Sequence, residues 1–129
     1  MGVDDAAVMG VFRIPADFAN PEGTRHIVVE ALVDTGATVC QLPRRLAASI
    51  GLAPSTRRRF RLASGELVER EVADIRVSLL GDSTRCDCAI GDDAAEIILG
   101  SVALEQMGLA VDPGGQQLIP GTMWLLAQA

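Results

Sequence analysis

One carboxylate in this sequence stands where it could do chemistry. Asp34 directly follows the apolar run Ala31–Val33 and precedes Thr35 and Gly36, so the chain turns where the acid sits. An acid at the end of a buried strand costs desolvation free energy unless it is hydrogen-bonded or used. Asp34 is therefore the first candidate for a catalytic group. Taken alone, these residues are equally typical of an Asx-type turn that satisfies its own hydrogen bonds.

Two further segments have patterns that fit a site. Ser64 and Gly65 lie between two extended arms, and glycine supplies the positive φ of a tight turn, so a β-hairpin with a two-residue Ser64-Gly65 turn is predicted. Ile97–Gly100 is a short apolar run ending in glycine, with Ser101 as the expected N-cap of a helix. This order of strand, turn and short helix repeats that of the first half of the chain.

Short strands are predicted to carry these segments. A strand over residues 8–14, ended by Pro15, and a strand over 26–33 form a hairpin that delivers Asp34. A helix follows, begun by Pro43 and ended by Gly51. Further strands are expected over residues 60–63, 66–72, 75–79, 85–90, 109–111 and 117–119, with a turn at 81–83. The pattern predicts a mainly β domain with one or two short helices.

Composition and charge limit the function classes. The 129 residues are 49% hydrophobic, which favours a single domain over 1–129 with its core at about 8–120 and an apolar tail over 121–129 around Trp124. The net charge of −6 argues against a nucleic-acid binder, and Arg57–Arg59 is interpreted as a solvated strand edge. No basic leader or long apolar run is found near the N-terminus, so no membrane partner and a cytoplasmic location are expected.

The cysteines and the single histidine give weaker signals. Cys40, Cys86 and Cys88 cannot all pair within one chain, which favours a reducing compartment. Cys86 and Cys88 would share a strand face near acidic residues, but no Cys-x-x-Cys or histidine pair supports a metal site, so no metal and no cofactor are expected. His26 is expected at the surface where its strand begins, and no motif supports a Cys40 nucleophile with His26.

Taken in order, Leu32–Ala37, Ala63–Gly65 and Ile98–Gly100 before a helix resemble the retropepsin-like aspartic proteases. The likeness is strongest to their single-domain bacterial and retroviral branch and spans roughly residues 8–120. It implies a closed β-barrel in which Asp34, Thr35 and Gly36 form the catalytic turn, and Ser64-Gly65 tips a mobile flap. It also implies substrate-binding positions at Ala37, Leu62, Ala63, Ser64, Gly65 and Ile98.

The chemistry of that family implies a second chain. Its members hydrolyse peptides with two carboxylates that share one proton, a dyad in which like charges force one pKa upward. Because this sequence has a single Asp-Thr-Gly, the resemblance implies a homodimer in which each chain supplies one Asp34. An aspartic endopeptidase acting on protein or peptide substrates is expected. The alternatives are a catalytically silent domain of the same fold used in binding or dimerisation, and an unrelated small β-barrel binding module, which would leave the acid unexplained.

Overall fold

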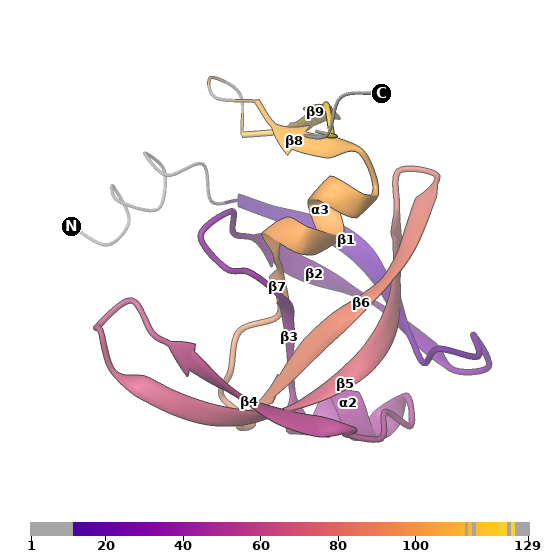
Figure 1. Ribbon diagram of the computed structural model, residues 1–129. Coiled ribbons are helices and arrows are strands. Elements are labelled where there is room, and N and C mark those ends of the chain that lie inside the picture. The colour runs from indigo at the N-terminus through magenta and orange to yellow at the C-terminus, as the bar shows by residue number, and fades with distance from the viewer. Residues whose placement is uncertain (1–11, 113, 115, 124, 126–129) are drawn as a thin grey trace.

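The computed structural model describes residues 12–112, 114, 116–123 and 125, which form a mainly β structure with two short helices (Figure 1). The predicted fold class is confirmed in these terms. In chain order the elements are β1 (Phe12–Ala19), β2 (His26–Val33), β3 (Cys40–Pro43), α2 (Arg44–Ser49), β4 (Thr56–Arg61), β5 (Leu67–Leu79), β6 (Asp82–Gly91), β7 (Ile98–Leu99), α3 (Ser101–Gln106), β8 (Leu109–Val111) and β9 (Leu118–Pro120).

Six of the strands form a ring. The main sheet has the order β1-β2-β7-β3-β6-β5-β4, and β1 also pairs with β5 through Asp17–Ala19. That extra pairing joins the two sides of the sheet and leaves β4, which pairs only with β5, outside the ring. Strands β8 and β9 make a separate two-stranded ribbon, drawn above α3 in Figure 1.

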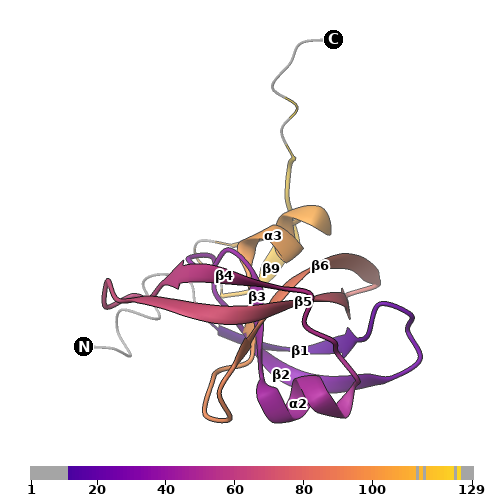
Figure 2. The same cartoon turned by 60° about the horizontal axis from the view of Figure 1, so that its bottom comes forward.

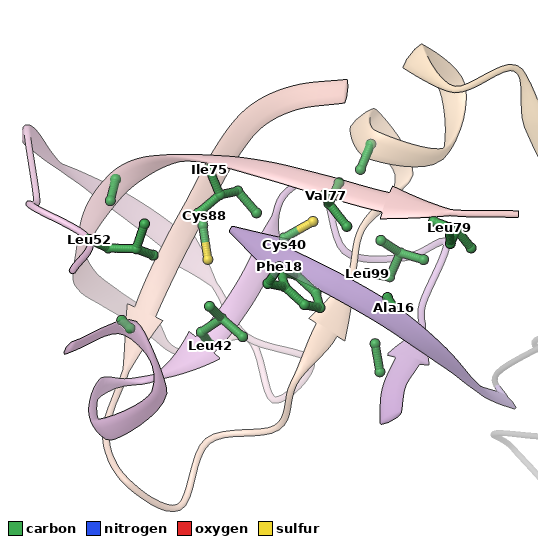
Figure 3. Packing of buried hydrophobic residues seen from close by; sticks show 14 of the residues in the cluster. Ala16, Phe18, Cys40, Leu42, Leu52, Ile75, Val77, Leu79, Cys88 and Leu99 are labelled. Carbon is green, nitrogen blue, oxygen red and sulfur yellow. The ribbon is translucent and has the colours of Figure 1, made fainter. Parts of the chain in front are cut away.

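The core lies between the strands of the ring (Figure 3). Phe18 is its one fully buried aromatic side chain among the described residues, and Leu42, Ile75, Val77 and Leu99 surround it with exposures of 0%. A sequence with three Phe, one Trp and no Tyr must fill its interior with aliphatic residues, and it does so here.

The first strand differs from its prediction. β1 continues through Pro15 to Ala19, whereas proline was expected to end it. At Pro15 the strand pairs with Glu30 of β2, but β5 begins to pair only at Asp17, so the proline stands where one edge of β1 is open. A residue without an N–H is tolerated at such an edge. The part of the predicted strand over residues 8–11 lies outside the described residues.

The region after the second hairpin was also predicted incorrectly in two details. β5 is one continuous strand rather than two, and the turn into β6 lies at Leu80 and Gly81, not at 81–83. Both residues have positive φ, 52° and 83°, which is typical of a two-residue hairpin turn. Leucine rarely adopts such a φ, so nothing in the local pattern indicated that the turn begins at Leu80 rather than at Gly81.

The helices are close to their predicted positions. α2 follows Pro43 and ends before Gly51, whose φ of +74° is the left-handed conformation expected of a helix-ending glycine. α3 begins at Ser101, one residue earlier than a Ser101 cap would require, because Gly100 occupies the N-cap position. Neither helix in the described part of the chain has the length and apolar character needed to cross a membrane.

Candidate active site

The position of Asp34 is fixed by main-chain hydrogen bonds to β7. Strand β2 runs parallel to β7, with Leu32 beside Ile98 and Val33 beside Leu99. The Leu32 N–H donates to the Ile97 carbonyl at 2.7 Å, and the Asp34 N–H donates to the Leu99 carbonyl at 3.1 Å. The backbone is therefore hydrogen-bonded to the neighbouring segment up to the amide of Asp34, and the loop begins directly after it.

The loop after β2 is an Asx turn. The Gly36 N–H donates to Asp34 Oδ1 at 2.9 Å, and the Ala37 N–H donates to the Asp34 carbonyl at 3.1 Å. Asp34 is half-buried, whereas Thr35 and Gly36 are exposed. Within the described residues, Gly36 is the one donor to the Asp34 side chain, so the second carboxylate oxygen has no hydrogen-bond partner among them. The turn thus satisfies half of the carboxylate and leaves half for another molecule.

The first residues of α3 are hydrogen-bonded to the second half of this loop. The Ser101 N–H donates to the Ala37 carbonyl at 2.8 Å, and the Val102 N–H donates to the Thr38 carbonyl at 3.1 Å. The sequence analysis did not identify these two amides. They belong to the backbone, so no side-chain pattern could have identified them.

The β4–β5 hairpin has a different tip from the one predicted. The Leu62 N–H donates to the Glu66 carbonyl and the Gly65 N–H to the Leu62 carbonyl, both at 2.8 Å. These bonds enclose Ala63, Ser64 and Gly65, with Gly65 at φ +91°. The tip is therefore a three-residue loop with glycine in the left-handed position, rather than a two-residue turn. All of residues 61–67 are exposed.

The structure brings the predicted site residues into two groups. Asp34, Thr35, Gly36 and Ala37 form one loop, with Ile98 next to it in β7. The second group is the hairpin tip, formed by Leu62, Ala63, Ser64 and Gly65. The tip and the loop after β2 extend towards the same side of the molecule in both views (Figures 1 and 2). No hydrogen bond between described residues joins the two groups.

Two cavities of the chain lie apart from Asp34, which is half-buried. A cavity of about 500 Å³ lies between α3 and β8, where Val102 and Leu109 line it. A smaller one of about 200 Å³ lies at the base of the hairpin, between Arg44, Arg57 and Glu71. Neither is lined by Asp34. Both cavities are therefore separate from the Asp34 turn.

The remaining candidates do not form a second site. Cys40 and Cys88 are buried, and the Cys40 and Cys86 sulfur atoms lie 4.0 Å apart as free thiols. Burial raises the pKa of Cys88 well above its ordinary value, so this thiol stays protonated. In the described part of the chain no group of three His, Cys, Asp or Glu side chains has a metal-binding arrangement. His26 lies at the surface, where its Nδ1 is 2.9 Å from Asp17 Oδ1.

Comparisons with known proteins agree with this architecture. Residues 24–106, more than half of the chain, match the family model described as gag-polyprotein putative aspartyl protease. The solved structure of EIAV protease complexed with the inhibitor HBY-793 is similar, with 18% identity, a TM-score of 0.57, and coverage of 76% of this chain and 88% of that one. A retropepsin-like aspartic protease from Rickettsia conorii is also similar, with 22% identity, a TM-score of 0.51, and coverage of 79% and 86%.

Among curated proteins, no match was found. The family match includes the Asp34 turn, the hairpin and α3, and the two structural likenesses independently give the fold. The chain therefore belongs to the family of gag-polyprotein aspartyl proteases and has a retropepsin-like fold.

Proposed function

We propose that the protein is an aspartic endopeptidase that cleaves protein or peptide substrates with two Asp34 carboxylates, one from each chain of a homodimer. One observation carries the proposal. The Asp34 turn is held on both sides by main-chain bonds to β7 and α3, yet one carboxylate oxygen has no partner in the described part of the chain. A rigidly placed acid with an unused oxygen is suited to act on a water molecule.

The proposed reaction needs both acids. Two carboxylates at hydrogen-bonding distance cannot both ionise, so they share one proton. The ionised carboxylate takes a proton from a water molecule, whose oxygen attacks the peptide carbonyl carbon, while the protonated one donates a hydrogen bond to the carbonyl oxygen. A proton then passes to the leaving nitrogen as the C–N bond breaks. The Gly36 N–H holds Asp34 in orientation throughout.

The single Asp-Thr-Gly of the sequence supports the dimer. A two-fold axis beside the loop after β2 would set the second Asp34 against the first, so that both chains line the site. In this arrangement Thr35, exposed next to the acid, braces the paired loops. Gly36 keeps the backbone close, because a Cβ there would lie 3.3 Å from Asp34 Oδ1.

The hairpin is assigned the role of a flap. Its tip is exposed and connects to the body only through its two strands, so it can close over a bound peptide. An extended peptide would be held by main-chain hydrogen bonds, with side chains against Ala37, Ile98, Leu62 and the Ala63–Gly65 loop. Closure would exclude water other than the attacking molecule.

Replacing the acid tests this function. Asp34→Asn keeps the shape and can still accept the Gly36 hydrogen bond, but an amide cannot act as a base. We expect peptide cleavage at mildly acidic pH to fall by about a thousandfold or more, with an unchanged thermal unfolding curve. Cleavage is measured on a mixture of fluorogenic peptides. Asp82→Asn, at the exposed start of β6, is the control and should retain activity. Undiminished cleavage by Asp34→Asn would rule the proposal out.

A further inference from the structure

The β4–β5 hairpin carries a charge opposite to that of the whole protein. All eleven basic residues of the sequence are arginines, and five of them lie between Thr56 and Val72. Against three glutamates, this gives the hairpin a net charge of +2 in a chain of net charge −6. The five arginines are Arg57, Arg58, Arg59, Arg61 and Arg70. So much positive charge on one exposed hairpin needs an explanation.

The strand register divides these arginines between two faces. β5 pairs without interruption from Leu67 to Leu79, and its core-facing residues Ala73, Ile75 and Val77 define the inner face of the hairpin. Because side chains alternate and cross-strand partners share a face, Arg59 opposite Glu69 and Arg61 opposite Leu67 belong to that inner face.

Two arginines lie on the outer face of the hairpin, Arg58 and Arg70, directly opposite each other. Phe60 and Val68 form the next cross-strand pair on that face. Both faces of the two strands thus carry arginines, and the inner face also carries Glu69 and Glu71. Arg58 and Arg70 therefore provide matched controls for a role assigned to the arginines of the inner face.

The acids of the inner face are already engaged. Glu69 pairs with Arg57 at 3.3 Å, and Glu71 pairs with Arg44 of α2 at 2.9 Å. Arg61 donates to the Gly65 carbonyl at 2.9 Å, and Arg59 forms no ion pair with any described residue. Two guanidinium groups near the tip therefore have no carboxylate partner in the described part of the chain. A guanidinium binds a carboxylate with two parallel hydrogen bonds, which makes it selective for that group.

We propose that Arg59 and Arg61 make the enzyme prefer peptides with an aspartate or glutamate side chain in the segment beneath the hairpin. The inference rests on the proposed function, in which an extended peptide lies between the hairpin and Asp34. The half-exposed Leu67, opposite Arg61, supplies apolar contact for the stem of the acidic side chain. An acidic peptide is favoured over a nucleic acid, because the net charge of −6 repels a polyanion.

Paired peptides test the preference. Each pair differs only by Glu or Gln at one position near the scissile bond, and kcat/KM is compared at pH 5.5 to 6, where glutamate is ionised. We expect the protein to favour one Glu peptide by about three- to tenfold. The double variant Arg59→Gln/Arg61→Gln should reduce that ratio to about one. Arg58→Gln/Arg70→Gln removes the same charge from the outer face and should keep the ratio.

The two proposals fail in different ways. Cleavage of the Gln peptides reports the protease itself, and the Glu-to-Gln ratio reports the arginines. If neither peptide is cleaved, the proposed function is wrong, and the same fluorescently labelled pair is titrated for binding to the unaltered protein. Equal dissociation constants would overturn the inference. A ratio lost equally in the outer-face variant, or tighter binding of a single-stranded oligonucleotide than of the Glu peptide, would also overturn it.

Discussion

Gly100 determines how closely the Asp34 loop can be held. A Cβ at this position would lie 2.4 Å from the Val39 carbonyl oxygen and 2.6 Å from its carbon, both backbone atoms that cannot move aside. The φ of Gly100 is −90°, which any residue can adopt, so the requirement is for space and not for conformation. The glycine lets α3 begin against the loop, where the Ser101 N–H reaches Ala37.

Adding one methyl group at Gly100 should therefore separate the two segments. We expect Gly100→Ala to lower the free energy of unfolding by about 1–3 kcal/mol, the usual cost of overpacking, and to reduce cleavage because Asp34 loses its support. Urea unfolding measures the first effect. Gly114→Ala, where nothing lies within 4 Å, is the control and should stay within about 0.5 kcal/mol of the unaltered protein. Equal stability of both variants would contradict this account.

At the scale of elements, local patterns in the sequence predicted most strands. The order of the strands in the sheet and the closure of the ring depend on long-range pairing. The β2 strand, the end of α2 at Gly51 and the presence of the β4–β5 hairpin follow from apolar alternation and glycine positions. Strand β7 has only two residues, and its place between β2 and β3 follows from topology. The ring closure between β1 and β5 joins segments about 60 residues apart, a distance over which periodicity carries no information.

The residues of the candidate site also fall into a part that the sequence predicts and a part that only the fold reveals. Asp34, Thr35 and Gly36 could be identified because a turn and an acid have side-chain signatures. The supports from Ile97, Leu99 and the start of α3 are carbonyls and amides that every sequence possesses, so only the fold reveals them.

Three thiols lie together on strands β3 and β6. They allow a prediction of how the stability of the fold changes at alkaline pH. Cys40 lies opposite Cys88 in the parallel register and beside Cys86. The hydrogen bond between Cys40 and Cys86 lowers the pKa of the first and raises that of the second, so the shifts of this pair oppose each other. Burial raises the pKa of Cys88, which has no opposing partner of this kind.

The pH dependence of stability follows from Cys88. With a folded pKa above the ordinary value of 9.0, the native state keeps a proton that the unfolded chain releases. The stabilisation is complete below about pH 8.5 and is lost as the pH rises towards the folded pKa, by up to about 1.4 kcal/mol per pH unit. The sequence contains no Tyr and no Lys, so the alkaline range involves chiefly the three cysteines, of which Cys86 also has a raised pKa.

We expect urea unfolding in reducing buffer to give a flat free energy from pH 7 to 8 and a decline above about pH 9. Cys88→Ala should be less stable at neutral pH, because it leaves a small cavity, but should show a shallower alkaline decline. The same slope in both proteins would mean that Cys88 does not control this range.

At the scale of the whole molecule, the proposed function depends on assembly. The single chain presents a half-buried Asp34 with one carboxylate oxygen unbonded by described residues, and the sequence holds no second Asp-Thr-Gly. Exposed apolar side chains near the C-terminus, Met123 at 63% and Leu125 at 94%, are available for a partner chain. Trp124, in the same apolar tail, lies outside the described residues.

Mixing chains tests whether two Asp34 residues act together. If unaltered and Asp34→Asn chains are unfolded, combined in equal amounts and refolded, random pairing makes only about one quarter of the dimers carry two acids. We expect the activity at constant total protein to follow the square of the unaltered fraction and reach about one quarter. A chain that works alone would give one half, and a linear decline would therefore contradict the shared site. Mixing with Asp82→Asn chains should leave full activity, because every dimer then keeps both copies of Asp34.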